Sequence, residues 1–168
     1  MLDIPGMDKW DKAFSKHEII EEFPEENGVI RIIEYLYIKF PLMMDNRDII
    51  QEKKAWKEYN GNKNQFLLVS KSVVHPSKPP QKKEIRAEMI LTGIYLREDI
   101  IGETLIYMIN HMDLKVKTGA DIVNRIAKKE PKTFIENLTN FCKKCSLIKI
   151  WHVIIKILRN KVFESYVI

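Results

Sequence analysis

The sequence predicts an α+β domain in which a long C-terminal helix lies across an antiparallel sheet. Six runs rich in apolar, β-branched and aromatic residues, at about 15–23, 29–40, 47–58, 65–75, 84–96 and 103–113, indicate strands. The connections between them are short, and short connections favour antiparallel neighbours because parallel strands need long crossovers. After Asp113 the apolar spacing becomes helical, so strands come first and a helix comes last.

The expected strands are separated by residues that end strands. Glycine, proline and asparagine are concentrated in these connections, and each favours a turn for its own steric reason. The connections read "PEENG" (24–28), "PLMMDN" (41–46), "NGNKN" (60–64), "HPSKPPQKK" (75–83) and "REDIIG" (97–102). They predict a meander of successive hairpins.

The expected C-terminal helix has a start signal and an internal interruption. Thr118 with Asp121 three residues later resembles a capping box. Pro131 would cost about 3 kcal/mol inside a helix, so we expect a break there or a second start with Pro131 in the first turn. The residues at helical spacing are Ile122, Ile126, Phe134, Ile135, Leu138, Phe141 and Cys142.

The tail 146–168 is apolar with one polar stripe. The stripe residues follow one another at spacings of three, four and three, which predicts an amphipathic helix. They are Lys149, His152, Lys156 and Arg159. A helix of this kind packs on its own domain, pairs with a partner or lies in a membrane interface. We expect it to pack on the domain.

Composition indicates a single globular domain of 168 residues, with 45% hydrophobic and 30% charged residues. The net charge of +5 comes from interleaved lysine and glutamate, which predicts a mixed solvated surface. No nucleic-acid-binding motif is present in the sequence, so we expect no nucleic-acid partner. A modest positive balance suits an anionic membrane surface better.

The sequence predicts a cytoplasmic protein without cofactor or metal. The start "MLDIPGMDKWDK" lacks the pattern of a signal peptide, and no run of about 18 uncharged apolar residues predicts a membrane span. Cys142 and Cys145 are the only cysteines, and we expect free thiols. Their CxxC spacing does not predict structural zinc, which needs four ligands.

Four motifs, in order, resemble those of the START lipid-transfer domain family. "KWDKAF" (9–14) resembles its WD segment, and "YIKFPLMMDNRDII" (37–50) resembles its K-aromatic-P stretch followed by N-R-D. "SVVHPSKPPQKKEIRAE" (72–88) is similar to its proline-rich loop and V-R-A strand, and "GADIVNRIAKKEPKTFIENLTNFCKK" (119–144) to its closing helix. The resemblance implies a helix-grip fold, a curved antiparallel sheet covered by a long C-terminal helix. It predicts a START-like domain at 1–145 followed by the tail 146–168.

Two features depart from the family pattern. The chain begins at the WD segment, whereas the family's domain normally opens with a helix and several strands before it. We therefore expect either a fragment or isoform, or a substitute such as the tail covering the exposed edge. In addition, "MDLKVKTG" (112–119) lacks the proline that usually precedes the closing helix.

The resemblance implies a non-enzymatic carrier that holds one lipid in a closed tunnel between sheet and helix. Each methylene exposed to water costs about 0.8 kcal/mol, so a long acyl chain or a sterol needs such a shield. The expected partners are a lipid ligand and, transiently, a membrane surface, and we expect a monomer. By resemblance the gate loop is Pro41, Leu42, Met43 and Met44. Alternatively the two methionines simply pack beneath this loop.

Register counting predicts an ion pair in the second hairpin. If Phe40 faces Arg47, then Glu34 faces Lys53, and Glu34 shares its strand face with Leu36 and Ile38. The pair is either an exposed cross-strand ion pair or part of a lipid site. Sterol-binding START members carry a comparable acidic–basic pair, which implies that Glu34 and Lys53 hold a hydroxyl or head group. The expected apolar lining is Leu36, Ile38, Ile49 and Met89 from the sheet, and Ile122, Ile126, Phe134 and Leu138 from the helix.

The resemblance favours a sterol or another neutral lipid over a phospholipid. Phosphatidylcholine-binding members carry arginine where Met7 stands, and aromatic residues where Leu36 and Ile49 stand. A quaternary ammonium needs aromatic faces. The rival readings are a lipid-sensing or scaffold module without transfer activity, and an enzyme of the same architecture. No GxSxG, HExxH or P-loop motif is present in the sequence, so we expect no catalytic residues.

Overall fold

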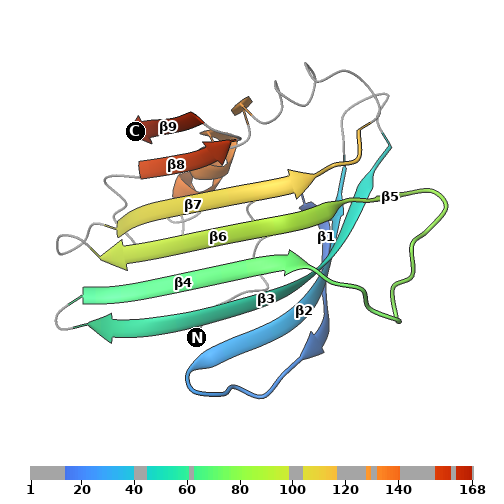
Figure 1. Ribbon diagram of the computed structural model, residues 1–168, viewed down its shortest axis with the longest axis horizontal. Helices are drawn as coiled ribbons and strands as arrows, with labels where there is room; N and C mark the ends of the chain where they lie inside the picture. Colours follow the sequence, from blue (N-terminus) through green and yellow to red (C-terminus); the bar gives the residue numbers. More distant parts are fainter. Residues whose placement is uncertain are drawn as a thin grey trace.

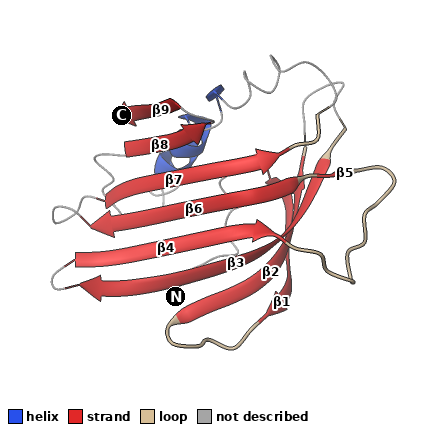
Figure 2. Cartoon of the chain, in the orientation of Figure 1, coloured by secondary structure: helices blue, strands red, loops and turns tan. Residues whose placement is uncertain are grey.

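A computed structural model describes residues 14–39, 45–60, 63–98, 104–116, 128–129, 132–140, 154–159 and 162–167. Residues 154–159 and 162–167 are described by their backbone alone. The described residues form a curved sheet with a helical segment against one face and a small hairpin beside its last strand (Figures 1 and 2).

The main sheet is the predicted antiparallel meander. Its hydrogen-bonded order is β1-β2-β3-β4-β6-β7, and the short strand β5 pairs in parallel with the start of β3. The strands are β1 (Phe14–Glu22), β2 (Val29–Ile38), β3 (Arg47–Asn60), β4 (Lys63–Ser72), β5 (Ile85–Arg86), β6 (Glu88–Glu98) and β7 (Thr104–Asp113). The six predicted runs therefore all contain strands, and the fifth run holds both β5 and β6.

The first hairpin closes at the predicted turn 24–28. Glu26 and Val29 exchange backbone hydrogen bonds of 2.9 and 3.3 Å, and Asn27 and Gly28 between them have φ angles of 52° and 74°. This left-handed region is open to glycine and comparatively accessible to asparagine, which explains why the turn uses these two residues.

The register predicted between β2 and β3 is wrong by two residues. Ile38, not Phe40, lies opposite Arg47, so that Glu34 lies opposite Gln51 and Ile32 opposite Lys53. The physical reason is the connection, which runs from residue 39 to residue 46 and is two residues longer than counted. Because side chains alternate with a period of two, an even error leaves every residue on its predicted face.

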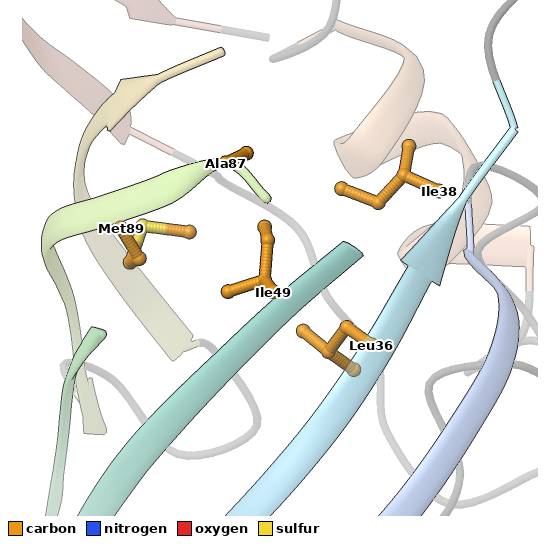
Figure 3. Packing of buried hydrophobic residues seen from close by; sticks show 5 residues of the cluster. All are labelled: Leu36, Ile38, Ile49, Ala87 and Met89. Atoms are coloured by element: carbon orange, nitrogen blue, oxygen red, sulfur yellow. The ribbon is translucent and has the colours of Figure 1, made fainter. Parts of the chain in front are cut away.

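One face of the sheet, called the inner face below, carries two apolar clusters. The first consists of Leu36, Ile38, Ile49, Ala87 and Met89, with Met112 and Leu114 against it (Figure 3). In the second, Ile106 of β7 packs on Ile135 of the helical segment 132–140. Cross-strand partners lie on the same face of a sheet. The successive pairs Lys57–Phe66, Phe66–Leu96 and Leu96–Ile106 run from β3 to β7. The helical segment therefore contacts the same face of the sheet that carries Ile49.

The opposite face has its own, smaller core. Ile33, Tyr35 and Ile50 are buried there, with Ile20, Phe23, Tyr37 and Val73 packed around them. Val73 begins the proline-rich connection to β5, and its amide donates to the Ile50 carbonyl at 3.0 Å. The connection therefore covers this outer face of β2 and β3.

The predicted long closing helix is not confirmed, because only residues 128–129 and 132–140 are described as helical. Ile122, Ile126 and Pro131 lie outside the described residues. No helix within the described part of the chain is long and apolar enough to cross a membrane.

The helix predicted for the tail is wrong over its described part. Strands β8 (Ile154–Arg159) and β9 (Val162–Val167) form an antiparallel hairpin, and β8 lies alongside β7 (Figure 1). The tail is rich in isoleucine and valine, which suit a pleated surface, and pairing of the two strands provides partners for their backbone groups.

Candidate functional site

A group of polar side chains is buried on the inner face at the centre of the first three strands. Glu34 of β2 is 0% exposed. His17 of β1 lies on one side of it, and Gln51 and Lys53 of β3 lie on the other. The side chains of His17 and Lys53 are each only 5% exposed, so the group has almost no contact with solvent.

Three donors converge on the Glu34 carboxylate. His17 Nε2 lies 2.7 Å from Oε2, and both Gln51 Nε2 and Lys53 Nζ lie 2.5 Å from Oε1. A buried carboxylate is stable only when it is paired and hydrogen-bonded, and this arrangement supplies both conditions. We call these four residues the Glu34 cluster.

The protonation state of Glu34 follows from two opposing effects. Burial by itself raises the pKa of the carboxyl group, but the hydrogen bond with His17, the charge and hydrogen bond of Lys53, and the Gln51 hydrogen bond together lower the pKa to about 2. The group is therefore a carboxylate at neutral pH, and the ionic character of the cluster is retained in the dry interior.

The structure brings Glu34 and Lys53 together although they are not directly opposite. A two-residue offset places Lys53 diagonally across from Glu34, within reach of a long side chain. Of the two readings, the exposed surface ion pair is wrong because both side chains are buried. A role of the pair in binding a ligand stays a prediction.

The expected apolar lining residues separate into two groups. Leu36, Ile38, Ile49 and Met89 lie together in one cluster (Figure 3). Leu36 and Ile49 are cross-strand partners, two residues along their strands from Glu34 and Gln51. Phe134 and Leu138 pack against Ile106 and Ile135 in the second cluster. Ile122 and Ile126 are outside the described residues, so their place is untested.

The predicted gate residues Pro41, Leu42, Met43 and Met44 also lie outside the described residues. The exit of that loop is described, and Arg47 forms a structural corner there. Arg47 Nε donates to the Leu114 carbonyl at 3.1 Å, and Arg47 also donates to the Asp45 carbonyl. These contacts tie the start of β3 to the segment that follows β7.

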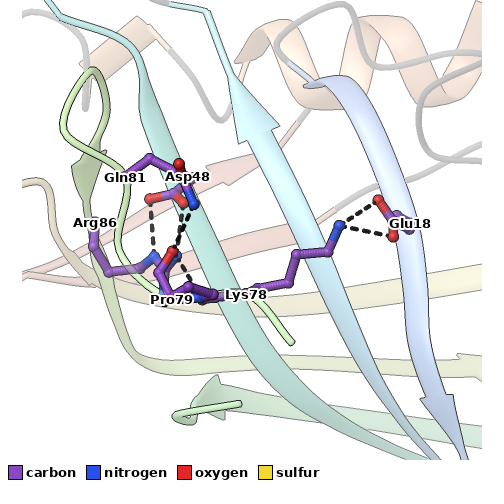
Figure 4. A network of polar contacts seen from close by, with 6 residues as sticks. All are labelled: Glu18, Asp48, Lys78, Pro79, Gln81 and Arg86. Carbon is purple, nitrogen blue, oxygen red and sulfur yellow. Dashed lines mark hydrogen bonds and ion pairs between the residues drawn. The ribbon is translucent and has the colours of Figure 1, made fainter. Parts of the chain in front are cut away.

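Asp48 forms the second half of this corner, on the outer face. Its carboxylate accepts two parallel hydrogen bonds from Arg86, at 2.9 and 2.8 Å, and Arg86 donates to the Lys78 carbonyl at 3.1 Å (Figure 4). Lys78 in turn pairs with Glu18 of β1 at 2.8 Å. The network fastens the proline-rich connection to the sheet, and within the described ranges no three metal-ligating side chains come together.

Two members of the Glu34 cluster were missed by sequence reasoning. No histidine has a catalytic partner at a recognisable spacing in the sequence, which predicts a loop, strand-end or surface position for each. For His17 this prediction is wrong because its ring is buried against Glu34. Irregular register on β1, between Phe14 and Lys16 and between Ile19 and Glu21, defeats simple counting there. Gln51 could have been found, because it alternates with Lys53 on the same face.

One comparison decides which protein family the motifs and the curved antiparallel sheet belong to. The sequence matches the START domain family over residues 1–147. The chain belongs to the START domain family. No curated protein sequence matches this START domain.

Two solved structures share its fold. Human STARD10 has 22% sequence identity and a TM-score of 0.59, over 84% of this chain and 58% of that one. Human StAR-related lipid transfer protein 5 has 17% identity and a TM-score of 0.63, over 82% of this chain and 64% of that one. This START domain thus spans about three fifths of the length of these two neighbours, and at these identities the likeness concerns the fold.

Proposed function

We propose that this START domain binds one lipid against the inner face of its sheet and carries it between membranes without chemical change. The observation that carries the proposal is the Glu34 cluster, a fully buried ionic group placed directly beside the aliphatic wall of Leu36 and Ile49. A lipid has the same two parts, a polar end and an apolar body. The name of the second structural neighbour, a lipid transfer protein, supports the same class of activity.

The polar end of the ligand is proposed to be neutral, as in a sterol or another neutral lipid. The charge of Glu34 is already balanced by Lys53, so a charged head group would add an uncompensated charge in a dry interior. The flanking Leu36 and Ile49 offer no aromatic face to a quaternary ammonium group. A phospholipid is the less favoured ligand on both grounds.

Lipid exchange is proposed to occur at the end of the sheet that carries the connection 39–46, with Pro41 to Met44 as the gate. At this end the Met89 amide donates a hydrogen bond to Ser72 Oγ at 2.8 Å, which brings the end of β4 next to the start of β6. The exposed apolar side chains of the two segments are Val74 at 96%, Ile90 at 45% and Leu91 at 39%. The exposed cations nearby are Lys71 at the end of β4 and Lys82 and Lys83 in the connection before β5, and one exposed carboxylate, Glu88, begins β6.

Apolar tips among lysines suit transient contact of a cytoplasmic monomer with an anionic membrane surface. Val74→Asp is expected to reduce binding to vesicles that contain phosphatidylserine. The matched control is Asn27→Asp, which makes the same charge change at an exposed turn position at the opposite end of the sheet and should leave binding unchanged. Equal binding by both variants and the unchanged protein would remove Val74 from the contact.

The central proposal is tested by native mass spectrometry of the purified chain, with extraction of any co-purifying lipid, followed by transfer of labelled lipid between vesicles. We expect one lipid per chain and transfer of many lipids by each protein molecule. Binding without transfer would favour the alternative, a lipid-sensing or scaffold module. Absence of lipid binding across sterols, diacylglycerols and phospholipids would overturn the proposal.

A further inference from the structure

One atom of the Glu34 cluster has an unused hydrogen-bonding capacity. Gln51 is 4% exposed, and its Oε1 has no hydrogen-bond partner among the described residues. Most buried side-chain oxygens in native proteins accept a hydrogen bond, because an unpaired one loses its interaction with water and gains nothing. An unpartnered acceptor at this position therefore points to a ligand group that donates.

The orientation of this amide follows from its neighbour. Only the amide nitrogen of Gln51 can donate, and it does so to Glu34 Oε1 at 2.5 Å. The amide oxygen is therefore directed away from the carboxylate. Both oxygens of Glu34 already accept hydrogen bonds, from His17, Gln51 and Lys53, so the acceptor of this cluster that has no partner among the described residues is Gln51 Oε1.

The same corner also holds donors. Lys53 Nζ lies 2.5 Å from the Glu34 oxygen that Gln51 contacts, and an ammonium group carries three N–H donors. Gln51 and Lys53 lie on the same face of β3, two residues apart. A ligand group that both donates and accepts would satisfy the amide oxygen and an ammonium proton together. A hydroxyl group has this property, whereas an ester or an ether only accepts.

We infer that Gln51 accepts a hydrogen bond from a free hydroxyl group on the polar end of the bound lipid, and that Glu34 positions Gln51 without touching the ligand. The inference rests on the proposed function and narrows it to lipid alcohols, such as a sterol with a free hydroxyl or a diacylglycerol. Lipids whose hydroxyl is esterified or etherified would leave the buried amide oxygen unpaired and bind more weakly.

The test compares matched ligands on matched variants. Cholesterol and its 3-O-methyl ether, and a diacylglycerol and its O-methyl ether, are titrated against the full chain. We expect the free alcohol of at least one pair to bind about tenfold more tightly than its ether, a ratio in the range that an unpaired buried acceptor produces. In Gln51→Met the ratio should fall close to one, whereas Gln65→Met, the same substitution on β4 outside the cluster, should keep it.

The ratio between alcohol and ether separates the hydrogen bond from steric effects. A methyl group that merely collides with the wall would lower affinity equally in Gln51→Met and in the unchanged protein, and this result would overturn the inference. Gln51→Ala, which also removes the acceptor, gives the same readout if the Met variant fails to fold. Tight binding of alcohol and ether alike would overturn the inference while leaving the proposed function standing. No binding of any lipid would reject the proposed function as well.

Discussion

Removing the charge of Glu34 should destabilise the fold, because it leaves Lys53 buried without its counter-ion. The ligand role that the family resemblance implies for Glu34 predicts that Glu34→Leu weakens lipid loading far more than folding. The structure changes this expectation, since Lys53 is only 5% exposed and lies 2.5 Å from the carboxylate. Breaking a buried ion pair by removing one partner typically costs about 3–5 kcal/mol.

The lowered pKa of Glu34 corresponds to a stabilisation of the same order, because it has the same contacts as its cause. Folding lowers this pKa from 4.5 to about 2, and each pH unit corresponds to about 1.4 kcal/mol, so the ionised form stabilises the fold by about 3 kcal/mol. For a chain of 168 residues a loss of this size lowers the melting temperature by about 6–12 °C. Loading measurements on Glu34→Leu alone would therefore mix binding with stability.

Urea denaturation followed by tryptophan fluorescence measures this loss in the free energy of unfolding at pH 7. Glu34→Leu should lose about 3 kcal/mol, and Glu34→Leu with Lys53→Met should recover much of it, because a neutral pair needs no compensation. Glu136→Gln is the control, since that side chain is 58% exposed in a helical pair with Lys132 at 3.9 Å and should change stability by less than about 0.5 kcal/mol.

The pH dependence of the free energy of unfolding tests the direction of the Glu34 effect. Because the pKa of Glu34 is lower in the folded state than in the unfolded state, its stabilisation is fully present above pH 4.5 and is lost as the pH falls towards 2. Glu34→Leu should lack this part of the acid dependence. If Glu34→Leu unfolds at the same urea concentration as the unchanged protein, and with the same acid dependence, the buried ion pair does not stabilise the fold and the reasoning is refuted.

Three further predictions concern the frame around the site. Ile49→Ala should cost about 2–5 kcal/mol in urea denaturation, because Ile49 is 0% exposed in the inner cluster; a loss below 1 kcal/mol would show that the wall is loosely packed. Asp48→Asn should free the connection that Arg86 holds, seen as faster tryptic cleavage there at unchanged cleavage elsewhere, and an unchanged rate would show that the ion pair is dispensable. Deletion of 146–168 should lower the melting temperature because β8 lies against β7; a loss of vesicle binding at constant stability would instead make the tail a membrane anchor.

Much of the sheet could be predicted because local patterns determine it. Alternating apolar residues and turn-forming residues identify each strand of the meander, and the order of four motifs identifies the family. The face of Glu34 was also predictable, since an error of two residues in register preserves the alternation of side chains.

Other features depend on contacts between segments that no local pattern describes. His17 reaches Glu34 because irregular register on β1 turns its ring inward, and the burial of Glu34 and Lys53 depends on the residues that the rest of the chain places around them. The tail has a helical polar stripe, yet its described part pairs as a hairpin beside β7. Sequence periodicity thus determined which face each residue occupies. Tertiary packing decided which of these faces became dry, because burial depends on what the rest of the chain places over them.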